Sequence, residues 1–461
     1  MDKIHDLLTR RVPREIASHI FAQCISSNPS PYQRAFIMQP LVLGAVCQSW
    51  RDIAWTTPQL WTTIVIVIGP TRDSHSQLEL LEQWIARSGH LPLDISFRTP
   101  MNPEALIVEP LFYPLIDLVN RYSSRWQGLY LFVSSSLFNR FTGDGGTISI
   151  LRHLTLIFSP FGFGEDREAG RFSLGMVSPQ PQSLILCNIA PSIVDIKWNN
   201  LTQLKASLRV DELLEILNDT HQLVSCIVFN CFDTSTAEYH IPDSPILLRC
   251  LRHLEIRSCL VDPSEIVEAI TTPCLRQLYA SFWNEGLLVH SFNSFIICSD
   301  CNLEALRLSG LIAGDGELVT ILKYLPSSLQ QLSLEPNLDT NPRPWLTKEV
   351  WDLFKSTRNP RDASKPCFFP NLKSFQYDGP QTFSWPDMIE TLFNPPSAPL
   401  TNYRLQTLDI TVGMDEHLAP IDPNTLRIIH EFRGSGLDIV IMKRDPDDID
   451  FVAYSMIDHF D

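Results

Sequence analysis

The side chains best suited to chemistry in this 461-residue sequence are its eleven cysteines and twelve histidines. Cys298-x-x-Cys301 has the spacing of half a zinc site. A structural zinc ion needs about four ligands, however, and neither a second cysteine pair nor a suitably spaced histidine accompanies this one. The pattern favours a turn or core thiols, so we predict neither a metal site nor a cofactor.

A second candidate is the glycine-rich segment Thr142-Gly-Asp-Gly-Gly146. It lacks the Gly-Lys-Ser/Thr sequence that holds and neutralises phosphate groups, so we interpret it as a turn. The sequence also contains neither a Gly-x-Ser-x-Gly elbow nor a His-Glu-x-x-His helix. His153 and His253 each follow a leucine by two positions, which indicates a place in a repeat rather than a site. We therefore expect no catalytic residues.

Composition limits the possible partners. Lys and Arg number 36 against 52 Asp and Glu, a net charge of −16, and 44 % of residues are hydrophobic. An acidic protein is poorly suited to bind nucleic acid. The polar start lacks a cleavable apolar run, and the β-branched run Ile64–Ile68 is far too short to span a bilayer. We expect a cytoplasmic or nuclear protein with free thiols and no membrane contact.

Residues 12–62 predict three short helices. Val12-Pro13 places proline in a first turn, where its missing N–H costs nothing. Apolar residues then recur at helical spacing, at Ile16, Ile20, Phe21 and Cys24. A second helical pattern runs from Leu41 through Trp50 to Trp55. So small a core often needs a partner to cover its remaining apolar surface.

Three motifs of this segment together resemble an F-box, particularly the F-box-like modules of fungal proteins. They are Val12-Pro13-x-Glu15-Ile16-x-x-x-Ile20-Phe21, Val46-Cys47-x-x-Trp50-Arg51-x-Ile53-Ala54 and Pro58-x-Leu60-Trp61. Val12 replaces the family's usual leucine and Gln48 its usual basic residue. The loop over residues 25–40 is also longer than in the shortest F-boxes.

The resemblance implies docking onto the Skp-type adaptor of a cullin-based ubiquitin ligase. A helical apolar face can insert between a partner's helices, with a few buried anchors supplying most of the affinity. The implied adaptor-binding residues are Val12, Pro13, Ile16, Ile20, Phe21, Val46, Cys47, Trp50, Arg51, Leu60 and Trp61. The alternative is that these residues pack with one another inside the module. Both roles stay open for Trp50 and Ile53, whereas the family match favours adaptor contact for Pro13, Ile16 and Phe21.

Residues 65–122 form a joint that is also similar to the fungal F-box family. A helical stripe through Trp84 ends near Gly89, and Leu91–Phe97 alternates as a strand before a second helix at about 108–121. From about residue 126 the pattern Leu-x-x-Leu-x-Leu recurs. First positions at 201, 223, 251, 275, 303 and 329 lie 22 to 28 residues apart, within the ~20–29-residue period of leucine-rich repeats.

Helical segments lie between these strand patterns, so each unit leaves an apolar face that its neighbours cover. The predicted fold is α/β, with a small three-helix F-box followed by a leucine-rich-repeat-like solenoid whose parallel sheet lines the concave face. The predicted domains are residues 8–64, 65–122 and 123–444, with an acidic C-terminal tail over 445–461.

Side chains between the repeat leucines should point outward on the concave sheet, where a protein target could bind. The candidates are Tyr130, Phe132, Glu255, Arg257, Tyr279, Arg307, Glu335 and Gln376. For each of them the alternative is an ordinary solvated strand face.

The sequence as a whole predicts a non-catalytic substrate-recognition subunit of a Skp-cullin-F-box ubiquitin ligase. Its repeats would recruit an unknown protein target and raise the effective concentration of a target lysine near ubiquitin. The alternative is a leucine-rich-repeat interaction scaffold outside any ligase. An enzyme within the repeats has the least support, because the motifs are missing.

Overall fold

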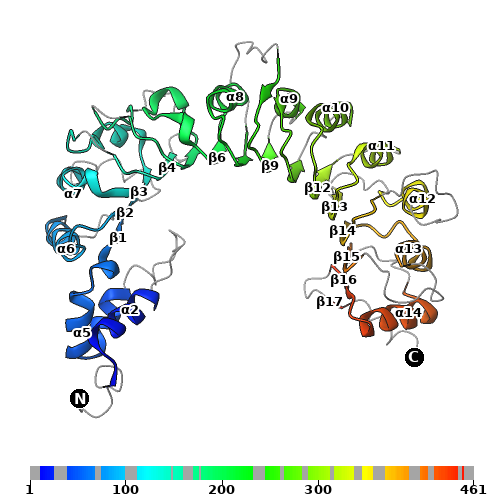
Figure 1. Cartoon of the computed structure of the whole chain (residues 1–461), viewed down its shortest axis with the longest axis horizontal. Helices are drawn as coiled ribbons and strands as arrows, with labels where there is room; N and C mark the ends of the chain where they lie inside the picture. The colour runs from blue at the N-terminus through cyan, green and yellow to red at the C-terminus, as the bar shows by residue number, and fades with distance from the viewer. Residues whose placement is uncertain are drawn as a thin grey trace. The chain divides into compact units, whose positions relative to one another are not determined.

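The structure is a computed structural model. It describes residues 11–24, 39–67, 74–98, 112–146, 149–158, 170–175, 178–231, 244–259, 264–282, 289–311, 316–336, 345–356, 369–393, 405–413, 420–444 and 449–450. The chain divides into two compact units, Met1–Leu204 and Lys205–Asp461. The boundary lies inside the region predicted as repeats, and strands of the repeat pattern occur in both units (Figure 1).

Unit 1 begins with helices. They are α2 (Arg14–Cys24), α4 (Gln39–Val46), α5 (Gln48–Trp55) and the 3-10 helix η1 (Pro58–Trp61). The pattern predicted as one helix from Leu41 to Trp55 is two helices, because Cys47 has an extended backbone with φ of −158°. Its sulfur accepts a hydrogen bond from the Trp50 amide at 3.5 Å and so caps α5.

A cluster of tryptophans joins these helices to α6 (Ser74–Arg87). The buried ring of Trp61 lies 5.4 Å from Trp55 and 4.7 Å from Trp84, and its Nε1 donates to the Ala54 carbonyl at 2.8 Å. The Arg87 guanidinium lies over the Trp55 and Trp61 rings, 4.9 and 4.7 Å from their centroids. The helical segment therefore shares its core with the first helix of the following α/β region.

That region is a parallel sheet whose strands follow chain order. It contains β1 (Thr63–Val67), β2 (Leu93–Arg98), β3 (Trp126–Val133), β4 (His153–Phe158) and β5 (Ser183–Cys187). Helix α6 connects β1 to β2, and α7 (Tyr113–Asn120) connects β2 to β3. Gly89 follows α6 with φ of +60°, in the left-handed conformation expected of the predicted C-cap.

Unit 2 repeats a strand and a helix. Its long sheet contains β6 (Gln203–Ser207, which begins at the unit boundary), β7 (Ser225–Phe229), β9 (His253–Cys259), β11 (Gln277–Phe282), β12 (Ala305–Leu311), β13 (Gln331–Pro336), β14 (Ser374–Gly379), β15 (Thr407–Val412) and β16 (Asp438–Lys443). The short strands β8 (Ile246–Leu247) and β10 (Ile270–Thr271) pair with each other in a separate sheet. The helices of unit 2 are α8 (Val210–Asp219), α9 (Ser264–Glu268), α10 (Val289–Ser299), α11 (Glu317–Tyr324), α12 (Lys348–Ser356), α13 (Trp385–Leu392) and α14 (Pro423–Gly434). The pairs from β7 to β16 are parallel, so the predicted α/β fold with a parallel sheet is confirmed.

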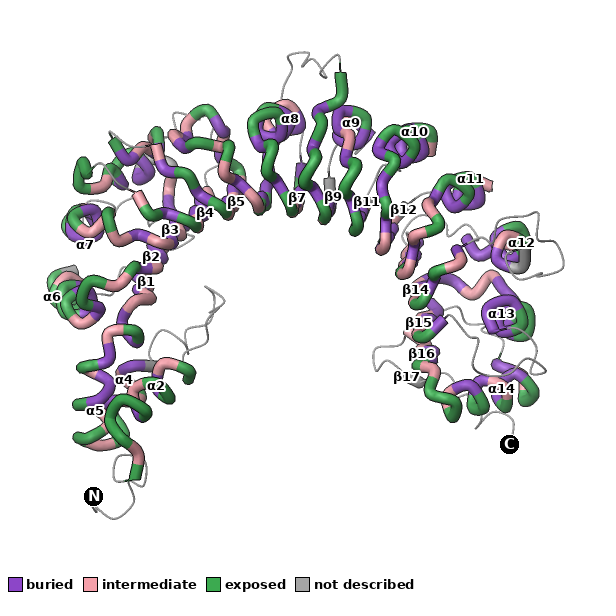
Figure 2. The backbone as a smooth tube through the Cα atoms, in the orientation of Figure 1, coloured by how far each residue is buried: buried purple, intermediate pink, exposed green. Residues whose placement is uncertain are grey.

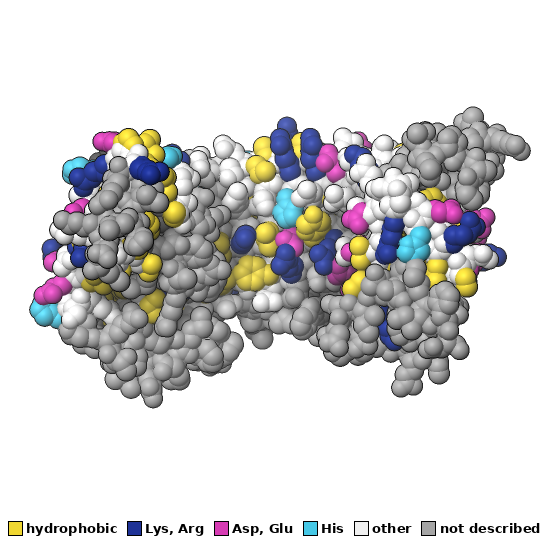
Figure 3. Space-filling model, turned by 90° about the horizontal axis from the view of Figure 1, so that it is seen from below, with side chains coloured by type: hydrophobic (Ala, Val, Ile, Leu, Met, Phe, Trp, Pro, Cys, Tyr) yellow, Lys and Arg dark blue, Asp and Glu magenta, His cyan; other side chains and the backbone are white. Residues whose placement is uncertain are grey.

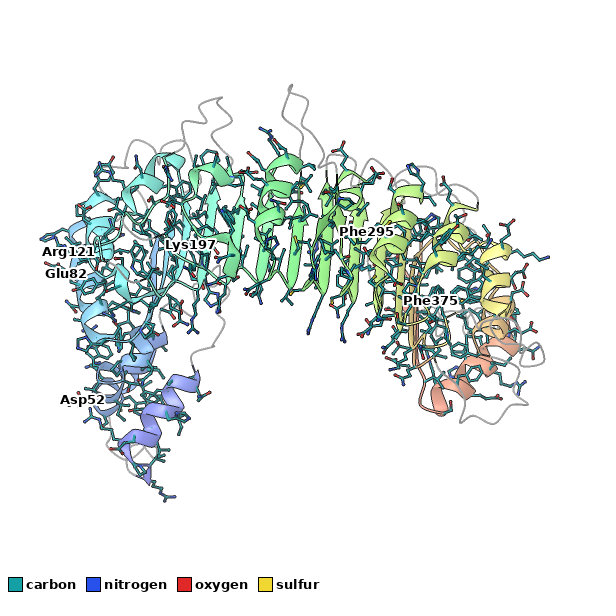
Figure 4. The ribbon with its side chains drawn as sticks, turned by 45° about the horizontal axis from the view of Figure 1, so that its top comes forward. Asp52, Glu82, Arg121, Lys197, Phe295 and Phe375 are labelled. Atoms are coloured by element: carbon teal, nitrogen blue, oxygen red, sulfur yellow. The ribbon has the colours of Figure 1, made fainter. Side chains whose placement is uncertain are left out.

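The strands of unit 2 form one layer and its helices another (Figure 1), with the buried residues between them (Figure 2). The repeat leucines build this core, because they align across the strands. One buried level contains Cys226, Leu254, Leu278, Leu306, Leu332, Phe375, Leu408 and Ile439. Figure 4 labels Phe375 on β14 and Phe295 on α10, which belong to the same buried core.

The strands from β9 to β15 each begin with the same backbone contact. The carbonyl of Arg252 accepts the amides of Arg276 and Gln277, both at 2.9 Å. The carbonyls of Arg276, Glu304, Gln330 and Lys373 repeat this double acceptance for the strands that follow. It persists between β13 and β14, although the interval from Leu329 to Leu372 is much longer than the others. In each of these strands, one carbonyl of the preceding strand segment marks where the pairing begins.

Residues 25–38 of the loop predicted over 25–40 fall outside the description, whereas residues 39 and 40 already belong to α4. Most of the predicted acidic tail also lies outside the description, but Ile449–Asp450 forms β17, antiparallel to the end of β16. In the described part of the chain, no helix has both the length and the apolar character needed to cross a membrane.

Candidate protein-binding surfaces

Helix α2 has one buried and one exposed apolar face. Ala17 and Phe21 are buried, and the Phe21 ring lies 4.9 Å from Trp50 of α5. Ile16 and Ile20 are 52 % and 38 % exposed, and Pro13 precedes them on the same side. Spacings of three and four residues put these three side chains in one row along the helix. Each isoleucine of the row thus keeps more than a third of its surface exposed.

A second exposed apolar row lies on α4. Val42 and Val46, one helical turn apart, are 61 % and 51 % exposed. The helix packs on α5 at Gly44, where a Cβ would lie only 1.9 Å from the Trp55 ring. Four of the eleven large hydrophobic side chains found exposed in the described chain therefore lie on α2 and α4. Such a concentration marks a candidate interface.

The structure divides the predicted adaptor-binding residues into two groups. Exposed or half-buried positions are Val12, Pro13, Ile16, Ile20, Val46, Cys47, Trp50 and Arg51. Phe21, Leu60 and Trp61 are buried within unit 1, so they support the helices from inside. Val42 joins the exposed group although sequence reasoning missed it; its position four residues before Val46 was the available signal.

The second candidate surface is the outer face of the unit 2 sheet. The strand registers align Glu255, Tyr279, Arg307, Ser333, Gln376 and Asp409 in one row. A second row contains Arg257, Ser281, Ser309 and Glu335, and continues with Asp378 and Thr411. Six of the eight predicted target-binding residues thus share two adjacent rows.

In these rows the arginines lie above the carboxylates that hold them. Arg257 is bonded through Nε to Glu255, and the Arg307 Nη2 lies 2.7 Å from Glu335 Oε1. The arginine side chains are 60 % and 52 % exposed, against 8 % and 17 % for their partners. The buried carboxylates therefore orient guanidinium groups that face solvent.

An aromatic pair lies beside the arginines. The ring of His253 is 5.2 Å from that of Tyr279, and its Nδ1 is 3.1 Å from Gln277 Oε1. The other nitrogen, Nε2, is 3.6 Å from Glu255. The repeat register that sequence reasoning assigned to His253 therefore places it at the base of this surface.

The strands toward the C-terminal end of the sheet carry acidic side chains. Burial raises the pKa of Asp378, Arg444 opposes this by an ion pair, and the charges of Glu335 and Asp409 raise it further. Burial also raises the pKa of Asp409, to which Asp438 adds repulsion. The sheet face thus changes from exposed guanidinium groups to clustered carboxylates.

The other two predicted target-binding residues lie on β3 in unit 1. Burial, assisted by the charge of Asp94, raises the pKa of Tyr130 to about 12. Phe132 is buried, with the Arg98 guanidinium 4.9 Å from its ring centroid. Both aromatic rings are therefore largely occupied by contacts within their own unit.

The motifs that could have done chemistry have structural positions. Gly143 and Gly145 have positive φ, and the Asp144 carboxylate accepts the Gly146 amide at 2.9 Å, as in a turn. Cys298 is exposed on α10, whereas Cys301 is buried. Within the described residues, no three His, Cys, Asp or Glu side chains are grouped as metal ligands.

Comparison with known proteins adds no relative. No protein-family model matches the chain, and no curated protein matches it. A functional assignment therefore has to come from the residues on the two surfaces.

Proposed function

We propose that this protein is a non-catalytic substrate-recognition subunit of a Skp-cullin-F-box ubiquitin ligase. In this proposal α2, α4 and α5 form the F-box-like module that binds the Skp-type adaptor. The sheet of unit 2 belongs to a leucine-rich-repeat-like array that binds the target. The complex would act in the cytoplasm or nucleus, where the adaptor operates.

The observation that carries the proposal is the exposed apolar row of Pro13, Ile16 and Ile20 on α2. Isoleucines are usually buried, and a row of them in a small helical segment indicates a surface that a partner covers. The row coincides with the first F-box motif of the sequence, Val12-Pro13-x-Glu15-Ile16-x-x-x-Ile20-Phe21. Fully burying one such side chain contributes about 1.5–3 kcal/mol, so a few anchors suffice for stable docking.

The proposed mechanism is proximity. A target held on the sheet face and an adaptor held on α2 and α4 would be carried by one chain, so ubiquitin transfer to the target becomes effectively intramolecular. The chain itself would make and break no bonds.

A binding assay with a purified Skp-type adaptor tests the proposal. Ile16→Asp should weaken capture of the adaptor about tenfold or more, because a charge would be placed in an apolar contact. Ile16 is half exposed, so this change tests the surface with less damage to the core than a change at Trp50 or Phe21. Circular dichroism would check that the variant is folded.

Leu80→Asp is the matched control, since Leu80 is similarly exposed but lies on α6. It should leave adaptor capture unchanged. If the wild-type chain does not capture the adaptor, or if both variants capture it as well as wild type does, the ligase assignment fails. The chain is then an interaction scaffold outside a ligase.

A further inference from the structure

The sheet face of unit 2 has two halves of opposite charge. On β9 and β12, Arg257 and Arg307 project to solvent above the more buried Glu255 and Glu335. A guanidinium has five N–H donors, more than one carboxylate accepts, and the guanidinium groups of Arg257 and Arg307 are more than half exposed. Donors therefore remain for an anion on a partner. Figure 3 looks onto this side, where Lys and Arg side chains gather in the middle of the view.

The other half lies on β14 to β16. Asp409 is half-buried in the same row as Arg307, and Asp438 is exposed at the start of β16. Asp378 lies in the neighbouring row and is paired with Arg444. The strand registers make Asp378 and Asp409 diagonal neighbours across β14 and β15, and Asp409 and Asp438 diagonal neighbours across β15 and β16. A cation on a partner would relieve the repulsion between these carboxylates.

The strand spacing fixes the distance between the halves. Neighbouring strands are about 4.8 Å apart. Arg307 on β12 and Asp409 on β15 are separated by three strand steps, or roughly 14 Å. An extended chain advances about 3.3 Å per residue, so roughly four residues cover this distance.

We infer that this face binds an extended protein segment that carries a block of acidic residues about four residues away from a block of basic residues. The acidic block lies over Arg257 and Arg307, and the basic block lies over Asp378, Asp409 and Asp438. Charge-assisted hydrogen bonds to arginine supply attraction. A segment with charges of only one sign is repelled by the half of the face that carries the same sign. This repulsion makes the face selective for segments with two blocks of opposite charge.

This inference rests on the proposed function only for the assignment of the sheet as the target-binding face. The inference concerns the charge pattern of the target segment, whereas adaptor binding depends on α2 and α4. A peptide-binding measurement on the full chain without adaptor therefore tests it separately.

Fluorescence anisotropy with four labelled synthetic peptides of equal length provides the test. One has an acidic block and a basic block separated by about four neutral residues, and one has the same composition with alternating charges. The others are uniformly acidic and uniformly basic. The block peptide should bind about tenfold or more tightly than each of the others, and its binding should weaken with salt. Equal binding of the block and alternating peptides, or tighter binding of the uniformly acidic peptide, would overturn the inference.

Charge reversal on the protein sharpens the test. The double variant Arg257→Glu/Arg307→Glu should weaken binding of the block peptide about tenfold or more, and it should strengthen binding of the uniformly basic peptide. The control Arg121→Glu/Arg427→Glu changes the net charge equally at two exposed positions, one directly after α7 and one on α14. If the control weakens binding as much, net charge rather than this face explains the result and the inference is wrong.

A milder variant guards against misfolding of the first. The double variant Asp409→Asn/Asp438→Asn removes negative charge and adds no positive charge. It should therefore weaken binding of the block peptide and strengthen binding of the uniformly acidic peptide. If the affinity for neither peptide changes, the acidic half does not contribute to peptide binding and this part of the inference is wrong. Ile16→Asp should bind all four peptides as wild type does, whatever it does to the adaptor.

Discussion

Gly44 shows how single residues determine the packing of the N-terminal helices. The Trp55 ring occupies the space that a side chain at Gly44 would need, with its Cζ3 atom 1.9 Å from an added Cβ. The ring has little freedom to move, because it also contacts Trp61 and Arg87. Close approach of α4 and α5 therefore depends on glycine at this position.

We predict that Gly44→Ala lowers the free energy of unfolding by about 1–3 kcal/mol, the usual cost of overpacking. Urea denaturation followed by tryptophan fluorescence would measure it. Gly434→Ala is the control, since an added Cβ there meets no atom within 4 Å. Equal stability of the two variants would show that Trp55 moves aside without cost.

Two aspartates should respond to pH in opposite directions. Burial and Asp438 raise the pKa of Asp409, so its charged form opposes folding at neutral pH. Hydrogen bonds from Ser178 and Ser173, with help from Arg171, lower the pKa of Asp195. Its charged form therefore stabilises the fold, and this contribution is lost as pH falls through its lowered pKa.

Accordingly, Asp409→Asn should stabilise the protein at pH 7 and Asp195→Asn should destabilise it. The Asp409 difference should fade as pH falls through the raised pKa of Asp409 toward the ordinary pKa of aspartate. The Asp195 difference should shrink only below that ordinary pKa, where the unfolded chain is protonated. Chemical denaturation at neutral and acidic pH would measure them. A destabilised Asp409→Asn variant at neutral pH would contradict the assigned sign.

Residue exposure was the least predictable property of the N-terminal surface. Ile16, Ile20 and Phe21 all fit one apolar helical face in the sequence, yet Phe21 is buried and the isoleucines are partly exposed. Adjacent residues on a helix differ by 100° in direction, and only the position of α5 decides which side is covered. A single sequence does not contain that position.

At the scale of elements, the repeat leucines predicted the strands well. The copies that begin at Leu251, Leu303, Leu329 and Leu405 lie on β9, β12, β13 and β15, because buried residues at alternate positions suit a strand whose one face is covered. The break at Cys47 was missed, because a cysteine sulfur is an unusual helix cap. The strand β1 also lies outside the repeat pattern, although its residues are β-branched.

The cap of α14 gives a prediction at the same scale. Asp422 Oδ1 accepts the amides of Asn424 and Thr425 at 3.1 and 3.0 Å. Asp422→Ala should cost about 1 kcal/mol of stability, within the usual range for a lost N-cap. The exposed Glu431, which pairs with Arg427 in the same helix, offers a control: Glu431→Ala should cost at most about 0.5 kcal/mol. Thermal denaturation would compare the two, and a larger effect at Glu431 would contradict the capping role.

At the scale of the whole molecule, the sequence predicted a repetitive α/β chain with parallel strands, and the structure has one in each of its two units. The boundary after Leu204 was not predicted, because the leucine pattern continues across it. Compactness depends on which neighbours a repeat contacts, and a repeat pattern alone does not report that.

In an array of repeats, a defect should spread to neighbours before it reaches distant strands. Leu306→Ala on β12 should destabilise unit 2 by about 2–5 kcal/mol, since the side chain is buried in an aligned row. Hydrogen exchange should then rise most in β11, β12 and β13 and least in β16. A uniform rise across all these strands would show that the unit opens as a single block.

The carbonyl that receives two amides at the start of each strand from β9 to β15 has a consequence for the history of the chain. Between β13 and β14 the same contact forms despite a much longer connection, so a new strand finds its register without help from the residues between. Gain or loss of a whole strand–helix unit, or growth of one connection, can then leave the remaining sheet undisturbed. Descendants of a common ancestor could thus diverge in length faster than in architecture, and chimeras joined at these carbonyls should be good starting points for engineering.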